Sequence, residues 1–289
     1  MTRQSNSGEA LSSHSPAPNP TALSGTARIE AAFLVAKEEG RAALMPYMMA
    51  GFPDRETSSA VAEAYAESAD LIELGVPFSD PLADGPTIHA AATAALEAGA
   101  TLDMALEICE EIAARVPVVF MAYANMVLAH GGAAEFARRA LAAGACGAIV
   151  PDLPLEEAEP VRIAFDDAGL ALVPLVAPTT PAERRGRICA AARGFIYVVS
   201  TVGTTGERAE LPAELAELVA ATKEDAEVPV AVGFGIGTPG QAAQVGRLAD
   251  GVIVGSRLVR AAGEATGAGA AADAVDSFLR EARVALANS

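Results

Sequence analysis

Short apolar segments alternate with longer amphipathic ones along most of this chain. The segments between the apolar runs carry hydrophobic residues at the three- and four-residue spacing of a helix. Continuous apolar strands, each followed by a helix, are typical of a parallel sheet that helices cover on both faces. The predicted strands are 43–50, 70–78, 117–126, 146–152, 170–178, 194–200, 228–235 and 250–256.

Eight strand–helix units predict an α/β protein with a closed, parallel (β/α)8 barrel, also called a TIM barrel. This fold typically takes about 250 residues, and the chain has 289. We expect an extra N-terminal helix at 27–40, where helical spacing ends at a glycine. A doubly wound open sheet is the alternative fold. The barrel is expected to form a single catalytic domain over residues 27–289.

Residues 1–26 are rich in Ser, Pro and Asn, so we expect a disordered N-terminal tail there. The tail has neither the apolar core of a secretory signal nor an arginine-rich amphipathic pattern, which favours a cytoplasmic protein. Apolar runs elsewhere are much shorter than the roughly 20 residues of a membrane-spanning helix. We therefore expect no membrane segment.

Composition and charge argue against several further classes. Hydrophobic residues make up 52% of the chain, and the formal net charge is −17. Nucleic-acid binding requires clustered Lys and Arg. A chain with this much negative charge is therefore not expected to bind nucleic acid. The three histidines lie far apart with no metal-ligand spacing, and no metal site is predicted. The cysteines, also widely spaced, are expected to be reduced core thiols: Cys109, Cys146 and Cys189.

One acid, Glu73, lies inside the predicted apolar strand 70–78. Side chains alternate along a strand, which places Glu73 with Leu71 and Gly75 in the barrel interior, near its upper rim. Burying a carboxylate costs several kcal/mol and raises its pKa, so Glu73 is a candidate proton carrier. The alternative is a structural ion pair, although the other predicted strands contain no Lys or Arg.

Active sites of such barrels lie at the carboxyl ends of the strands. Asp80 and Asp84 follow Glu73 in a loop with Pro and Gly, where either aspartate is as well suited to making a turn as to chemistry. The glycine-rich segment "STVGTTGERAELPAEL" at 200–215 suits a mobile lid that closes on an anion.

Two adjacent strand ends carry small residues that suit a phosphate site. Glycines there allow the backbone to approach an anion closely, and a helix N-terminus supplies free N–H groups. Ordinary turn glycines are the alternative interpretation. The residues concerned are Gly233, Gly235, Gly255 and Ser256.

Six motifs, in order over about 27–287, together resemble the tryptophan synthase α chain family. They are "ELGVPFSDPLADGPTI" (73–88), "YAN" (123–125), "VPDLPLEE" (150–157), "STVGTTG" (200–206), "GFGI" (233–236) and "GS" (255–256). The resemblance implies a lyase that cleaves indole-3-glycerol phosphate to indole and glyceraldehyde 3-phosphate by a retro-aldol reaction. In this chain, His89 and Thr204 replace residues that are more usual in the family.

The resemblance also implies the roles of individual residues. Glu73 would be the general acid and base, Asp84 would bind the indole N–H, and Tyr197 would be the active-site tyrosine beside Glu73. Thr205 and Gly206 match the lid, and Gly206 also matches the phosphate cradle together with Gly235, Gly255 and Ser256. The residues expected near the aromatic pocket are Tyr47, Met121 and Ile88.

No metal or cofactor is implied for this chain. The implied partner is a tryptophan synthase β chain that holds pyridoxal phosphate, in an α2β2 heterotetramer. Three alternatives stay open: a stand-alone indole-3-glycerol phosphate lyase, another phosphate-binding barrel such as a sugar-phosphate isomerase, and a non-catalytic regulatory subunit. The last two do not account for Glu73 and Asp84 in one motif.

Overall fold

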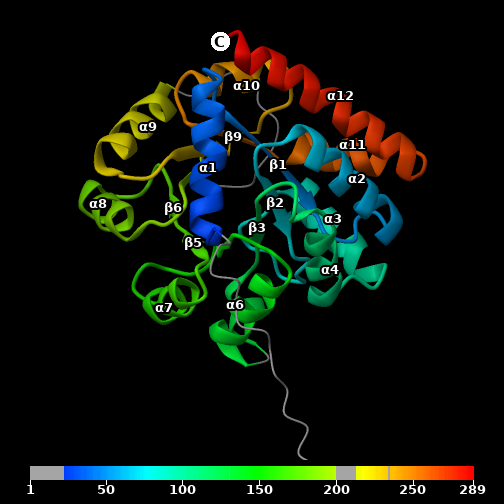
Figure 1. The fold of residues 1–289 in the computed structure, drawn as a ribbon, viewed down its shortest axis with the longest axis horizontal. Helices are drawn as coiled ribbons and strands as arrows, with labels where there is room; N and C mark the ends of the chain where they lie inside the picture. The colour runs from blue at the N-terminus through cyan, green and yellow to red at the C-terminus, as the bar shows by residue number, and fades with distance from the viewer. Residues whose placement is uncertain (1–22, 130, 200–212, 234) are drawn as a thin grey trace, which may run out of the picture.

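The barrel prediction is confirmed. The computed structural model describes residues 23–129, 131–199, 213–233 and 235–289, in which parallel strands form one nine-stranded sheet that helices surround (Figure 1). The strands lie in the order β5-β4-β3-β2-β1-β9-β8-β7-β6. Their bounds are β1 Ala43–Met49, β2 Ile72–Gly75, β3 Val118–Met121, β4 Gly147–Ile149, β5 Ala171–Val173, β6 Leu175–Val176, β7 Ile196–Val199, β8 Val230–Gly233 and β9 Gly251–Val254.

The two ends of the sheet belong to one predicted strand, 170–178, which Pro174 divides into β5 and β6. Proline has no backbone N–H to donate to a neighbouring strand. Its carbonyl still accepts a hydrogen bond from the backbone N–H of Tyr197 at 3.0 Å. Because β5 pairs with β4 and β6 pairs with β7, this one run closes the barrel.

The predicted N-terminal helix is α1, Gly25–Glu38, which begins ahead of the boundary drawn at residue 27. The Ser24 hydroxyl accepts from the backbone N–H of Ala27 and caps the helix. Phe33 on α1 packs against Phe195 with ring centroids 5.7 Å apart. In Figure 1, α1 crosses the barrel and covers the amino-terminal ends of its strands.

The remaining helices form the outer layer. Three of them, α3, α5 and α11, follow β2, β3 and β9 in addition to the one helix expected for each strand–helix unit. The bounds are α2 Arg55–Ser68, α3 Pro86–Glu97, α4 Leu102–Ile112, α5 Ala124–Leu128, α6 Gly132–Ala142, α7 Glu159–Asp167, α8 Ala182–Ala191, α9 Ala213–Asp225, α10 Pro239–Gly246, α11 Ser256–Glu264 and α12 Ala268–Ala287. None of the helices within the described ranges is both long and apolar enough to cross a membrane.

Side chains of the strands fill the barrel in layers, as the alternation of each strand requires. In the lower interior, buried apolar residues such as Met45, Val119 and Ile253 pack against α1. Nearer the carboxyl ends, polar side chains enter the interior, and Tyr47 on β1 lies in register with Glu73 on β2. The barrel interior is therefore apolar at the amino-terminal ends of the strands and contains polar, ionisable side chains at their carboxyl ends.

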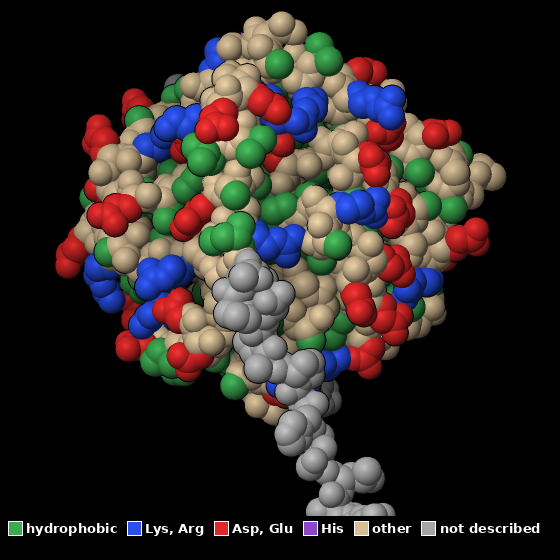
Figure 2. All heavy atoms as spheres, in the orientation of Figure 1, with side chains coloured by type: hydrophobic (Ala, Val, Ile, Leu, Met, Phe, Trp, Pro, Cys, Tyr) green, Lys and Arg blue, Asp and Glu red, His purple; other side chains and the backbone are tan. Residues whose placement is uncertain are grey.

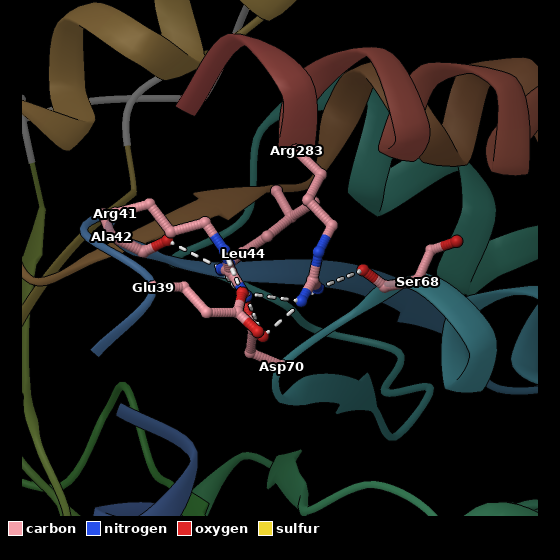
Figure 3. Close-up of polar contacts among 7 residues, drawn as sticks. All are labelled: Glu39, Arg41, Ala42, Leu44, Ser68, Asp70 and Arg283. Carbon is pink, nitrogen blue, oxygen red and sulfur yellow. Dashed lines mark hydrogen bonds and ion pairs between the residues drawn. The ribbon is translucent and has the colours of Figure 1, made fainter. Parts of the chain in front are cut away.

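Charged side chains at the amino-terminal ends of the strands form a compact cluster that connects α12 to the barrel (Figure 3). Arg41 is 7% exposed and donates to both carboxylate oxygens of Asp70, at 2.5 and 2.8 Å. Asp70 also accepts from the backbone N–H of Leu44 at 2.7 Å. Arg283 of α12 contacts Asp70 at 3.3 Å and Glu39 at 3.1 Å. Every member of this cluster has a charged or backbone partner.

The surface carries the rest of the charge in mixed patches. On the face shown in Figure 2, Lys and Arg side chains lie beside Asp and Glu over much of the molecule. Arg115, for example, bridges Glu63 and Glu67. This arrangement differs from the clustered basic face that nucleic-acid binding requires.

Candidate active site

A cavity of about 1110 Å³ opens at the carboxyl ends of the strands. Its lining combines tyrosines, two acids, apolar side chains and the small residues of the last two strand ends. Each predicted site residue that the structure describes lines it: Tyr47, Glu73, Asp84, Ile88, Met121, Tyr197, Gly233, Gly235, Gly255 and Ser256. The two predicted lid residues, Thr205 and Gly206, lie outside the described residues.

Glu73 points from β2 into the upper barrel interior, as the alternation of that strand predicts. The residue is 2% exposed, and its Oε2 atom has no hydrogen-bond partner within the described part of the chain. Burial, and next the negative charge of Asp84, raise the pKa of Glu73 to about 8. At neutral pH the carboxyl group therefore holds a proton that it can transfer.

Asp84 reaches the same cavity from the loop after β2. The loop is shaped by backbone hydrogen bonds from Leu82 N to Asp80 O (2.9 Å) and from Asp84 N to Pro81 O (3.0 Å). Burial raises the pKa of Asp84 to about 6, against a hydrogen bond from Tyr123 and the charge of His89, which both lower it. At neutral pH Asp84 is thus ionised while Glu73 is protonated, a difference that lets two neighbouring acids take different roles.

Asp80 has the turn-making role that the sequence left open for either aspartate. Its side chain is exposed, accepts a hydrogen bond from the Ser79 hydroxyl at 2.5 Å, and does not line the cavity. His89 is also exposed, on the first turn of α3. Asp80 therefore belongs to the turn, and Asp84 is the aspartate that faces the cavity.

Two tyrosines lie close to Glu73 in the upper interior. Burial raises the pKa of both Tyr47 and Tyr197, and the charges of Glu73 and Asp84 raise it further, so both hydroxyls stay protonated. A Cβ atom at Gly233 would collide with the Tyr197 hydroxyl, and one at Gly75 would collide with the Tyr47 hydroxyl. Gly233 therefore makes room for Tyr197, a role that its place at a strand end did not reveal.

The N-terminus of α11 faces the cavity at the end of β9. Gly255 is the N-cap residue and Ser256 is the first residue of the helix, where backbone N–H groups are free of helical partners. The neighbouring Arg257 lies over the ring of Phe278, with its guanidinium carbon 5.5 Å from the centroid. Backbone dipoles and a hydroxyl, together with Gly235 after the neighbouring strand β8, can thus hold an anion in this acidic chain.

Comparison with known proteins gives the family. The family model described as "Tryptophan synthase alpha chain" matches residues 33–286. The chain belongs to this family. The tryptophan synthase alpha chain of Synechococcus sp. (strain CC9902) is 49% identical over 242 residues, 82% of this chain and 90% of that one. That of Geobacter sulfurreducens is 46% identical, covering 81% of this chain and 89% of the relative.

Solved structures agree with this assignment. A structure of Mycobacterium tuberculosis tryptophan synthase in space group F222 superposes with a TM-score of 0.83 at 39% identity, over 90% of this chain and 98% of that one. The tryptophan synthase subunit alpha from Legionella pneumophila str. Paris gives 0.83 at 37% identity, over 93% of this chain and all of the other. The barrel is thus that of a tryptophan synthase alpha chain.

One residue of this alpha chain's site, Tyr123, was not assigned a role from the sequence. It is the first residue of the "YAN" motif, and its buried hydroxyl accepts from the backbone N–H of Ala83 at 3.0 Å and bonds Asp84. The motif placed Tyr123 at a strand end but not against a loop 40 residues away in sequence. Among the described residues, no group of His, Cys, Asp or Glu side chains forms a metal site.

Proposed function

We propose that Glu73, Asp84 and Tyr197 carry out the family's reaction in this chain. The chain is a lyase that catalyses the α reaction of tryptophan synthase, the retro-aldol cleavage of indole-3-glycerol phosphate to indole and glyceraldehyde 3-phosphate. The observation that carries the proposal is the buried carboxyl group of Glu73, whose Oε2 has no partner among the described residues, beside a second acid in an aromatic cavity.

Glu73 begins the reaction as an acid. It donates its proton to the indole ring carbon that bears the side chain, and positive charge then develops at the ring nitrogen. The carboxylate left on Glu73 takes the proton of the side-chain hydroxyl as the carbon–carbon bond breaks, so the proton balance closes on one residue. A pKa of about 8 suits both steps near neutral pH.

Asp84 stabilises the charge that the first step creates. Its ionised carboxylate accepts a hydrogen bond from the ring N–H, and the bond strengthens as the ring becomes positive. Tyr47, Ile88 and Met121 supply the surrounding apolar and aromatic walls. Tyr197, close to Glu73, is available to donate a hydrogen bond to the substrate or to Glu73 when it is ionised.

The phosphate group fits the opposite side of the cavity. We place it at Gly235, Gly255 and Ser256, where the α11 N-terminus supplies N–H groups, and we place Gly206 of the lid in the same cradle. Thr205 of the lid is proposed to contact Asp84 when substrate is bound. With both ends of the substrate held, the indole ring lies between the two acids.

The proposed partner is a tryptophan synthase β chain. It would carry pyridoxal phosphate and consume the indole, in an α2β2 heterotetramer in the cytoplasm. Membership of the alpha chain family supports this partner. The proton transfers assigned above call for no cofactor in this chain. We expect the isolated chain to be slow and the β chain to accelerate it by favouring a closed site.

Indole release by the purified chain, with and without β chain, tests the proposal. Glu73→Gln should lower kcat by about 10²- to 10⁴-fold, the contribution of a general acid–base, and Asp84→Asn should lower it less. Glu97→Gln, on the exposed end of α3, is the matched control and should retain full activity. If Glu73→Gln turned over normally, the proposed roles would be wrong. Wild-type turnover that ignored the β chain would favour a stand-alone lyase.

A further inference from the structure

Tyr123 connects the end of β3 to the loop that carries Asp84. Its side chain is 3% exposed, and its hydroxyl accepts a hydrogen bond from the backbone N–H of Ala83 at 3.0 Å. The carboxylate of the next residue, Asp84, interacts with the same hydroxyl, and this interaction lowers the pKa of Asp84. One hydroxyl thus holds the backbone of Ala83 and interacts with the acid of the residue that follows it.

Tyr123 is itself fixed from two further sides. Its ring stacks on Phe78, at the start of the Asp84 loop, with centroids 5.1 Å apart and planes inclined by 28°. The backbone N–H of the next residue, Ala124, donates to Asp152 Oδ1 at 2.7 Å, from the loop after β4. A tyrosine has few rotatable bonds, so these contacts leave its hydroxyl little freedom. Three neighbouring loops therefore meet at this residue.

We propose that Tyr123 is a positioning residue that holds Asp84 in the orientation and the ionised form that the substrate requires. The inference rests on the proposed function, in which Asp84 accepts the indole N–H. Tyr123 itself acts through Asp84, because its hydroxyl is already shared between Ala83 and the carboxylate. The role explains why a tyrosine, and not an apolar residue, occupies this buried strand end.

The electrostatic balance around Asp84 gives the expected effect of removing the hydroxyl. Burial raises the pKa of Asp84 to about 6, and the Tyr123 hydrogen bond opposes that rise. Without the bond, the protonated form gains, and Asp84 is neutral over more of the working pH range. The titratable groups that interact with Asp84 are Glu73 on β2, Tyr47 on β1, Tyr197 on β7, His89 on α3 and Tyr123 itself.

The experiment compares kcat/KM from pH 5 to pH 9 for the wild type, Tyr123→Phe and Tyr65→Phe. Tyr65→Phe removes the same atom from another buried tyrosine, whose hydroxyl donates to the Tyr47 carbonyl at 3.2 Å on the helix-facing side. In Tyr123→Phe the acidic limb should move upward by about one pH unit, the effect of one hydrogen bond to a charged group. The loss should be about tenfold below the limb and smaller at pH 9. Tyr65→Phe should leave the limb in place.

Two further measurements separate the possible failures. Asp84→Asn should abolish the acidic limb; if it kept both the limb and the turnover, the proposed role of Asp84 would fail, not only the inference. The Asp84 carboxyl can also be titrated directly by NMR in Tyr123→Phe, which needs no activity, after an unfolding curve has established that the variant folds. An unchanged Asp84 titration and an unmoved limb would overturn the positioning role.

Discussion

Two buried carboxylates lie three positions apart in sequence, one just before β2 and one within it, and their surroundings differ sharply. Asp70, ahead of β2, has a side chain 7% exposed and accepts hydrogen bonds from Arg41 and Leu44 (Figure 3). Glu73, within β2, is 2% exposed and leaves Oε2 without a partner among the described residues. Both acids are removed from water, and only one is compensated.

The difference separates an acid that holds the fold from an acid that serves the reaction. A buried charge with several donors is stable as a charge, and losing a donor exposes the full cost of its burial. A buried acid without donors avoids that cost by keeping its proton, and it gives the proton up only when the surroundings change. In this barrel the compensated acid lies at the amino-terminal end and the uncompensated one lies in the cavity.

The largest effect on stability is expected at the compensated end. Arg41→Met should lower the free energy of unfolding by about 3–5 kcal/mol, because Asp70 would stay buried with fewer donors. Urea denaturation measures the change. Arg280→Met removes an exposed ion pair with Asp276 on α12 and should change stability by less than about 1 kcal/mol. A loss below about 1 kcal/mol in Arg41→Met as well would contradict the structural role of the cluster.

A pH-dependent effect on stability is expected at Glu73. The folded chain raises the pKa of this acid from its ordinary value of 4.5 to about 8, so between these values the native state binds more protons than the unfolded state. The stability contributed by Glu73 is therefore fully present below about pH 4.5 and is lost as the pH rises to about 8. Glu73→Gln removes this titration.

Urea denaturation of the wild type and Glu73→Gln across pH 5 to 9 checks the pattern. The difference in unfolding free energy between them should shift steadily in favour of the variant as the pH rises. Asp84 titrates in both proteins, so the difference between them reports the glutamate together with its coupling to Asp84. A difference that stayed constant with pH would mean that Glu73 finds a compensating partner when ionised.

The barrel fold and the buried acid Glu73 were predictable from the sequence. Strand–helix alternation is a local pattern and gave the barrel, and an acid inside an apolar strand pointed to Glu73. Spacing did not distinguish Asp80 from Asp84; the family resemblance did, and the structure places only Asp84 in the cavity. The sequence did not reveal that Pro174 would split the closing strand.

The remaining features depend on contacts between distant segments. Arg41 and Arg283 both contact Asp70, and Tyr123 contacts Ala83, because the fold brings distant segments together, and no short sequence motif predicts such contacts. Gly233 resembles a phosphate-loop glycine in the sequence, and only the packed Tyr197 hydroxyl shows what its missing side chain makes room for. The sequence pattern pointed to the acids of the site, whereas the burial and the hydrogen-bond partners of each acid depend on the tertiary structure.

The ionisation of Glu73 itself decides whether this residue can act as the proton donor. The carboxyl carbon of Glu73 can be followed by NMR in isotope-labelled protein as the pH is raised, with Glu73→Gln to assign its signal. We expect a midpoint near 8, far above that of an ordinary glutamate. A midpoint near 4.5 would show that Glu73 is ionised at neutral pH, and it would contradict the role of this acid as the proton donor.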